Sequence, residues 1–202
     1  MAAHSRYSVS AKGAGMADGV LKNKLGITDQ KMLDDAETLL LSDAYTYFFN
    51  RLEREVFKFD LSFLFEIHKF FLGTLYTWAG KMRIVNIAKG DVLFAPAEYL
   101  QKTLTDFDSL LQTCLLISHD SKKVVAQKLA LIHNELNTIH PFREGNGRTT
   151  RLFLDLMAAH VGYFPINWEL TTQEKYIEAC KLGMTREHRL MEKIVYKGLM
   201  KR

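Results

Sequence analysis

The strongest constraint on the fold is a short polar run, residues 140–151, which lies between two segments with helical periodicity. The preceding segment, Val124–Ile139, repeats apolar residues at spacings of three and four, the pattern of a partly buried helix, and Pro141 ends it. A second periodic segment begins at Arg148. The sequence therefore predicts two helices joined by a short connection.

This connection contains residues suited to binding phosphate groups. Its sequence is His140-Pro-Phe-Arg-Glu-Gly-Asn-Gly-Arg-Thr-Thr-Arg151. The glycines of residues 145–147 accept positive φ and lack a Cβ, so they predict a turn whose N–H groups bind an anion, next to the positive end of a helix dipole. Arg148 and Arg151 share one helical face and can contact different phosphates. His140, at the end of the preceding helix, is suited to proton transfer near neutral pH.

Each of these residues also has a simpler interpretation. A histidine after a helix is usually a cap or core residue, and arginines at i and i+3 usually lie on a solvated face. His140 and Glu144 are four residues apart, a spacing found in zinc sites, but Pro141 and the glycines predict a loop and no third ligand is near in sequence. The joint occurrence of these residues favours phosphate chemistry.

The run His140–Arg151 resembles the signature of the Fic family, H-x-F-x-[D/E]-G-N-G-R-x-x-R, and matches every fixed position. Tyr76-Thr-Trp-Ala-Gly80 and the run Arg83–Phe94 resemble the family segment that forms a hairpin flap over the active site. The resemblance extends over roughly residues 25 to 200. It implies a mainly α, single Fic-type helical domain with a small β-hairpin flap. It also implies transfer of AMP from ATP to a Ser, Thr or Tyr hydroxyl of a target protein.

The resemblance implies a role for each matched position. His140 is the implied general base, and Glu144 the implied ligand of a Mg²⁺ ion that bridges the α- and β-phosphates. Arg148 is expected at the β-phosphate and Arg151 at the γ-phosphate. The residues implied to bind the nucleotide are Gly145, Asn146, Gly147, Arg148, Arg151, Lys89 and Gly90. A sister branch, the Doc toxins, has lysine in place of Gly147 and is associated with phosphate transfer, so glycine here favours attack on the α-phosphate.

The flap run Arg83–Phe94 has its own β-hairpin pattern. Residues 84–88 are β-prone, residues 89–91 form a turn, and residues 92–94 return. The edge of an isolated hairpin can pair with an extended segment of another protein through main-chain hydrogen bonds. We therefore expect this flap to dock the target protein.

A second expected partner is an inhibitor. Many Fic enzymes are inhibited by a helix with the sequence [S/T]-x-x-x-E-[G/N], whose glutamate pairs with the arginine corresponding to Arg151. The one matching spacing here is Ser62…Glu66, and Ile67 follows it. The sequence predicts no built-in inhibitory motif. A separate antitoxin-type protein, inhibition by another route, and a diverged motif all remain open.

The rest of the chain predicts one domain, residues 20–202, after a tail, residues 1–19, that is rich in Ala, Gly and Ser and predicted to be disordered. The tail resembles neither a secretion signal nor a membrane anchor. The predicted helices are Asp29–Phe49, Asp60–Tyr76, Pro96–Ile117, Lys122–Ile139, Arg148–His160, Thr172–Lys181 and Glu187–Lys197.

Composition excludes several other classes of protein. Cys114 and Cys180 lack paired spacing, which predicts no disulfide framework and fits a cytoplasmic protein, or one delivered into a target cell. The net charge of +4 is scattered, which indicates a solvated basic surface rather than a nucleic-acid site. No stretch is apolar enough for a membrane span. Two alternatives to AMP transfer stay open: a nucleotide-binding interaction module, and a Fic enzyme with a different phosphate donor.

Overall fold

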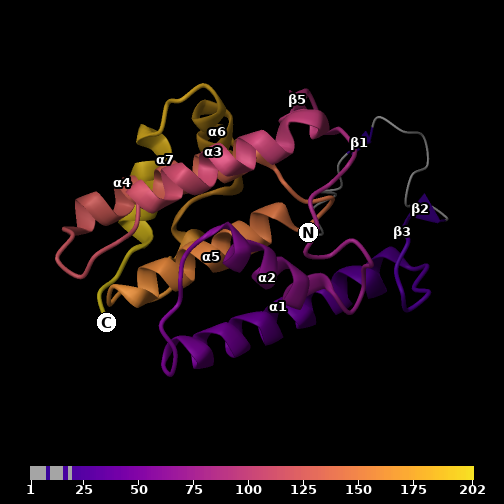
Figure 1. The fold of residues 1–202 in the computed structure, drawn as a ribbon, viewed down its shortest axis with the longest axis horizontal. Coiled ribbons are helices and arrows are strands. Elements are labelled where there is room, and N and C mark those ends of the chain that lie inside the picture. The colour runs from indigo at the N-terminus through magenta and orange to yellow at the C-terminus, as the bar shows by residue number, and fades with distance from the viewer. Residues whose placement is uncertain (1–7, 10–15, 18–19) are drawn as a thin grey trace.

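A computed structural model of the protein describes residues 8–9, 16–17 and 20–202. Within these residues the fold is mainly α, as predicted, and Figure 1 shows its arrangement. The helices are α1 (Gln30–Leu52), α2 (Leu61–Leu72), α3 (Leu100–Thr113), α4 (Lys122–Ile139), α5 (Asn146–His160), α6 (Gln173–Met184) and α7 (Arg189–Gly198). The strands are β1 (Ser8–Val9), β2 (Met16–Ala17), β3 (Val20–Leu21), β4 (Ile87–Lys89) and β5 (Val92–Leu93). Short 3₁₀ turns at Ala97–Tyr99 and Trp168–Leu170 precede α3 and α6.

Four helices begin at side-chain caps. In each case an oxygen of the capping side chain accepts a hydrogen bond from the backbone N–H three residues later, which satisfies one of the N–H groups that a helix start leaves without a partner. The caps are Asp29 for α1, Asp60 for α2, Ser121 for α4 and Thr172 for α6. The start of each of these helices is therefore encoded locally in the sequence.

Some helix ends differ from the sequence prediction. The helix predicted to end at Tyr76 ends at Leu72, and the chain then turns so that Leu75 and Tyr76 enter the core. The predicted helix Pro96–Ile117 divides into a 3₁₀ turn and α3, which ends at Thr113. Tertiary burial of the following apolar residues decides these ends, and periodicity alone cannot show it.

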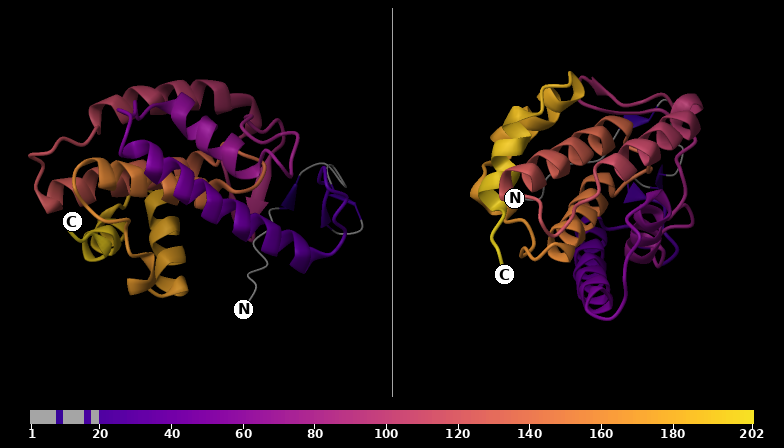
Figure 2. Two further views of the ribbon diagram at one scale, coloured as in Figure 1. Left: turned by 90° about the horizontal axis from the view of Figure 1, so that it is seen from below. Right: turned by 60° about the vertical axis from the view of Figure 1, so that its left-hand side comes forward.

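Helix α5 lies at the centre of the molecule. It packs against α1, α2 and α4, and its residues Leu152, Phe153, Leu154 and Leu156 are fully buried. In Figure 1 it lies between α1 and α2 below and α3, α6 and α7 above, and Figure 2 shows α6 and α7 together beside α4. Residues 152–159 of α5 are buried on every side of the helix, which places this part of it inside the core. The connection between α4 and α5 is thereby fixed between two buried helices.

The predicted flap hairpin is present, with shorter strands than expected. Strands β4 and β5 pair antiparallel, with Ala88 opposite Leu93 and Lys89 opposite Val92, around a two-residue turn in which Gly90 has φ +58°. Strand β1 pairs antiparallel with β4, which gives a three-stranded sheet in the order β1-β4-β5. The expectation of an isolated hairpin is wrong, because the edge of β4 is paired with this chain's own strand.

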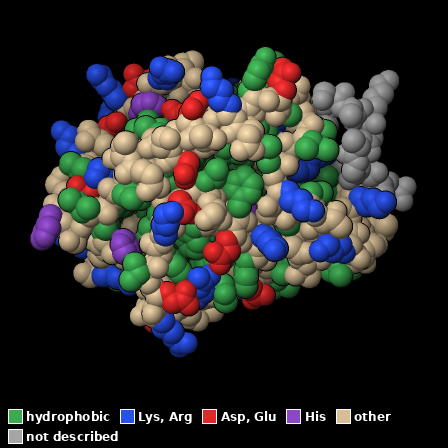
Figure 3. Space-filling view, in the orientation of Figure 1, with side chains coloured by type: hydrophobic (Ala, Val, Ile, Leu, Met, Phe, Trp, Pro, Cys, Tyr) green, Lys and Arg blue, Asp and Glu red, His purple; other side chains and the backbone are tan. Residues whose placement is uncertain are grey.

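Strands β2 and β3 form a second, two-stranded sheet. Within the tail predicted to be disordered, residues 8–9 and 16–17 form strands, and the remainder of that prediction lies outside the described residues. Cys114 and Cys180 are free thiols. In the described part of the chain, no helix is both long enough and apolar enough to span a lipid bilayer. On the face shown in Figure 3, basic and acidic side chains are interspersed.

Buried histidines make the stability of this fold sensitive to acid. Burial lowers the pKa of both His68 and His133 to about 4. Between pH 6.5 and 4 the unfolded chain binds protons at these positions and the folded chain does not, so the stability present above pH 6.5 is lost as the pH falls. Burial also raises the pKa of Asp155 to about 6, and this single group acts in the opposite direction.

We expect the free energy of unfolding, measured by urea titration, to fall by roughly 1 kcal/mol per pH unit for each of the three buried histidines, His68, His133 and His140, between about pH 6 and 4. His68→Gln should reduce this slope. His119 is exposed in the loop between α3 and α4, and His119→Gln is the matched substitution of a histidine outside the core. A wild-type stability that is constant or rises over this interval would contradict the assignment.

Candidate active site

His140 occupies the C-cap of α4 in the left-handed conformation, with φ 47° and ψ 65°. Its N–H donates to the carbonyl of Leu136, and the chain then leaves the helix axis at Pro141. Left-handed backbone is uncommon for a residue with a Cβ, and such conformations concentrate at functional sites. The position at a helix C-terminus agrees with the sequence prediction.

The hydrogen bond of the His140 ring fixes its tautomer. Nδ1 lies 2.5 Å from the carbonyl oxygen of Asn137. Because a carbonyl only accepts, Nδ1 carries the proton and Nε2 carries the lone pair. The ring stacks on Phe94 of the flap, with centroids 3.6 Å apart. His140 is therefore oriented by its hydrogen bond to α4 and covered by the flap.

Burial lowers the pKa of His140 to about 3, and the positive charges of Arg83 and Lys89 act in the same direction. The imidazole is therefore neutral at physiological pH, which is the form that accepts a proton. A bound anion beside it would raise this pKa, because a neighbouring negative charge favours the protonated form. Nucleotide phosphates would thus make His140 a stronger base.

Arg83 joins the flap to the end of α4. Its side chain is buried, and its guanidinium donates to main-chain carbonyl oxygens from two parts of the chain. The acceptors are those of His140 at 2.7 Å and Ile139 at 3.2 Å, and those of Val85 at 2.7 Å and Ala95 at 2.5 Å. The flap and the candidate base are therefore held as one unit.

His68 of α2 holds the opposite side of the connection. The N–H of Gly80 donates to its Nδ1 at 2.8 Å, so Nε2 carries the proton and donates to the carbonyl oxygen of Glu144 at 3.0 Å. The ring stacks on Phe142, with centroids 3.7 Å apart. Nothing in the sequence distinguished this histidine from other apolar-face residues of α2. Its role depends on contacts between segments far apart in sequence.

Gly145 forms the turn that starts α5. Its φ is +79°, and a Cβ there would lie 2.7 Å from Leu72 Cδ1, so both the conformation and the space require glycine. Helix α5 begins at Asn146, two residues before the predicted start, and its first N–H groups have no acceptor within the helix. A Cβ at Gly147 would meet only Arg151 Nη1, at 3.9 Å, so this side of the helix start is open. Open first-turn N–H groups form an anion-binding site.

Asn146 stabilises the loop with its side chain. Oδ1 accepts from the N–H of Phe142 and Nδ2 donates to the carbonyl of Phe142, both at 2.8 Å. Phe142 is buried, so this pair anchors the connection in the core. The backbone N–H of Gly145 donates to Glu144 Oε1 at 2.9 Å.

The two arginines at the start of α5 contact different helices. Arg148 Nη1 lies 2.7 Å from Glu37 Oε2 of α1, and Arg148 Nη2 lies 3.6 Å from Glu144 Oε1. Arg151 lies against the ring of Tyr176 of α6, with its Cζ 5.9 Å from the centroid. The sequence predicted both arginines but neither Glu37 nor Tyr176, because α1 and α6 are distant in sequence.

The side chains of this site fit a cation that is held jointly by the protein and a bound nucleotide. Among the described residues, no three His, Cys, Asp or Glu side chains gather into a protein-only metal site. Glu144 supplies one buried carboxylate beside the anion-binding start of α5. Mg²⁺ is commonly held by one or two carboxylates together with substrate phosphates and water. Glu144 therefore fits Mg²⁺ bound with a nucleotide. The other two predicted nucleotide-binding residues, Lys89 and Gly90, lie at the turn of the flap.

A helical domain with a histidine, a carboxylate and an anion-binding helix start in one connection is the arrangement of Fic proteins. The Fic/DOC family model matches residues 58–158, and this chain belongs to that family. A probable protein adenylyltransferase of Sinorhizobium fredii is 35% identical over 147 residues, which cover 71% of this chain and 73% of the relative. The protein adenylyltransferase VbhT of Bartonella schoenbuchensis is 34% identical over 162 residues, which cover 80% of this chain but only 33% of that protein.

A solved structure agrees with the fold. The N-terminal Fic domain of a putative cell filamentation protein from Bartonella quintana, with bound ADP, has a TM-score of 0.75 and 26% identity to this chain. The match covers 90% of this chain and 91% of that structure.

The role of Arg83 predicts a coupled loss of stability and flap order. Arg83→Lys keeps a positive charge, but a lysine cannot donate to four carbonyls. We expect the free energy of unfolding to fall by about 3 kcal/mol, because hydrogen bonds from charged groups contribute roughly 1.5–3 kcal/mol each and are not fully additive. Hydrogen exchange at residues 85–95 should become faster. Lys81→Ala, at an exposed neighbouring position, is the control and should change neither quantity. Unaltered flap exchange in Arg83→Lys would refute the link.

Proposed function

We propose that this protein is a protein adenylyltransferase that transfers AMP from ATP to a Ser, Thr or Tyr hydroxyl of a target protein. The observation that carries the proposal is the His140 tautomer, which places the Nε2 lone pair in the connection that ends at the anion-binding start of α5. A base and a phosphate site are thereby held together by a rigid connection. The names of the relatives from Sinorhizobium and Bartonella support the same activity.

In the proposed reaction the target hydroxyl oxygen attacks the α-phosphorus of ATP. The new bond joins this oxygen to phosphorus, the bond from the α-phosphorus to the bridging oxygen breaks, and pyrophosphate leaves. The hydroxyl proton passes to His140 Nε2, while the Nδ1–H bond to Asn137 keeps the ring in place. The first-turn N–H groups of α5, Arg148 and Arg151 bind the phosphates, and positioning with charge stabilisation supplies most of the catalysis. Glu144 would hold Mg²⁺, which neutralises charge on the phosphates.

The space at Gly147 supports transfer of AMP over transfer of phosphate. A side chain there would enter the open side of the helix start, where the phosphate chain is expected to bind. Glycine leaves that space to the nucleotide. This supports a pose with the α-phosphate toward His140.

We propose that the target docks on the flap as an extended segment paired with β4. The support is β1, which pairs with this edge in the structure and shows that it accepts an antiparallel strand. The pairing involves two residues on each strand, and so short a strand is weakly held. A target segment can therefore displace β1.

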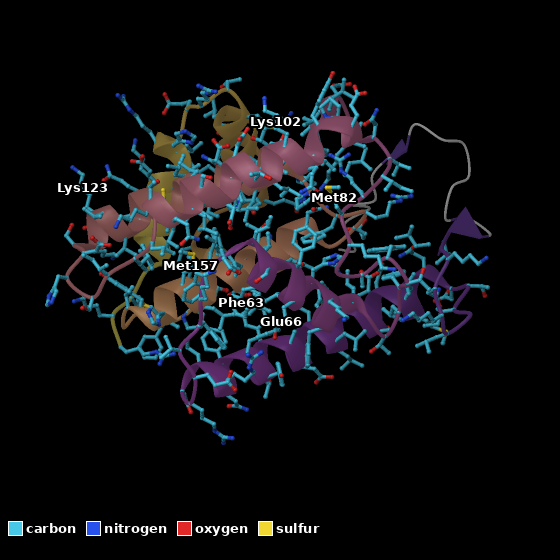
Figure 4. All side chains as sticks on the ribbon, viewed as in Figure 1. Phe63, Glu66, Met82, Lys102, Lys123 and Met157 are labelled. Carbon is cyan, nitrogen blue, oxygen red and sulfur yellow. The ribbon has the colours of Figure 1, made fainter. Side chains whose placement is uncertain are left out.

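For regulation we propose a separate protein that presents a glutamate to Arg151. The internal candidate, Glu66, is labelled on α2 in Figure 4, and it pairs with Arg51 at 2.6 Å. That pair lies on the outer side of α2, and Glu66 is half exposed. A glutamate at Arg151 would form a charge-assisted pair and exclude the γ-phosphate.

The base is tested with His140→Ala. We expect labelled AMP transfer from ATP to proteins of a cell lysate to fall by roughly 10²–10⁴-fold, because a general base contributes about that factor, while ATP affinity stays within a few-fold. His119→Ala, at an exposed position, is the control. Equal transfer by wild type and His140→Ala would refute the role. If the wild type binds ATP and labels nothing, the nucleotide-binding interaction module is the better description.

The docking edge is tested with a double proline variant, Ser8→Pro with Val9→Pro, and its matched control, Ser8→Ala with Val9→Ala. Proline removes the N–H groups needed for strand pairing, whereas alanine keeps them. We expect faster hydrogen exchange at residues 87–89 and several-fold faster labelling of lysate proteins with the proline variant only. Identical labelling by both variants would show that β1 does not compete with the target.

A further inference from the structure

Glu37 of α1 is a buried carboxylate at the start of α5, and it lies upstream of the segment that the family model matches. It is only 3% exposed. Its Oε2 lies 2.7 Å from Arg148 Nη1, and its Oε1 accepts a short hydrogen bond from the Tyr76 hydroxyl. Tyr76 is itself buried and stacks on Trp78, with centroids 4.4 Å apart. Tyr76 thereby fixes the orientation of Glu37.

Arg148 lies between two carboxylates of unequal distance. Glu37 contacts one terminal nitrogen at 2.7 Å, whereas Glu144 Oε1 is 3.6 Å from the other. The guanidinium also lies over the Phe71 ring, with its Cζ 5.1 Å from the centroid. About a quarter of the Arg148 side chain remains exposed. The arginine is therefore held on its α1 side and is still partly accessible.

We propose that Glu37 is a positioning residue that keeps Arg148 from forming a closer ion pair with Glu144, so that the Glu144 carboxylate can bind a cation and Arg148 remains directed at the phosphates. The inference rests on the proposed function, in which Glu144 holds Mg²⁺ with the nucleotide. Its physical basis is competition for one guanidinium. Both carboxylates are buried and each gains from pairing with Arg148, and Glu37, the closer partner, holds it.

Removal of the charge at position 37 changes that competition. With glutamine there, Glu144 is the remaining carboxylate that pairs with Arg148, and a small movement shortens the 3.6 Å ion pair to hydrogen-bonding distance. An arginine paired with Glu144 opposes a divalent cation at the same oxygens. In this variant the Mg²⁺ concentration needed for nucleotide binding should therefore rise by a large factor. The affinity for metal-free nucleotide should fall by a smaller factor.

The test is calorimetric binding of α,β-methylene ATP, whose α–β bridge cannot be cleaved, over a series of Mg²⁺ concentrations. For Glu37→Gln we expect a roughly tenfold higher Mg²⁺ requirement, since loss of a residue that supports a metal ligand typically costs 10–100-fold in metal affinity. Metal-free affinity should change by less than about threefold. Tyr76→Phe should move the Mg²⁺ curve in the same direction by a smaller amount, and it serves as the second variant if Glu37→Gln folds poorly.

Two controls separate positioning from simple attachment of α1. Glu66→Gln removes a carboxylate that pairs with an arginine on the outer side of α2, and it should leave the Mg²⁺ curve unchanged. In an Arg148→Ala background, Glu37→Gln should have no further effect on the Mg²⁺ requirement, because the competing guanidinium is absent. Persistence of the full effect in that background would overturn the proposal.

The remaining outcomes are equally decisive. A Mg²⁺ curve of Glu37→Gln that superimposes on the wild type, even with a lowered Tm, would show that Glu37 only attaches α1, and it would leave the proposed function intact. Wild-type binding that does not depend on Mg²⁺ would overturn both this inference and the proposed role of Glu144. The two failures are therefore distinguishable.

Discussion

The buried guanidinium of Arg83 is the interaction on which the geometry of the site depends. A buried cation is costly unless its donors are satisfied, and here they are satisfied by main-chain carbonyls from the end of α4 and from both sides of the hairpin. Displacing either the hairpin or the end of α4 would leave these donors without acceptors. The flap and His140 consequently keep one relative position, and Phe94 can stack on the imidazole.

The same principle orders the rest of the connection. His68 joins Gly80 to the carbonyl of Glu144, and the Asn146 amide closes on the backbone of Phe142. Each polar group is buried with a specific partner, which gives directional restraint where apolar packing would allow the loop to slide. A preorganised site of this kind does not need to reorient its dipoles during reaction. Rigid burial of the connection between two core helices is therefore also what prepares it for catalysis.

Local chemistry explains what the sequence could predict. The bounds of α4 agree with the predicted helix Lys122–Ile139, α2 begins directly after Asp60, and the hairpin turns at Gly90. These features depend on neighbours within a few residues. The end of α2 at Leu72 and the pairing of β1 with β4 were not predicted, because both depend on surfaces that exist only after the chain has folded.

The sequence by itself determined which functional groups this protein can bring together at its site. The order His140, Glu144, Gly145, Arg148 and Arg151 defines which groups can meet in one connection, because residues so close in sequence between two helices cannot separate far in space. Only the tertiary structure decided how those groups are charged, oriented and paired. Burial sets the pKa of His140, Asn137 sets its tautomer, and Glu37 from a distant helix holds Arg148. Protonation and pairing depend on solvent exclusion and on partners distant in sequence, and packing of the whole chain creates both.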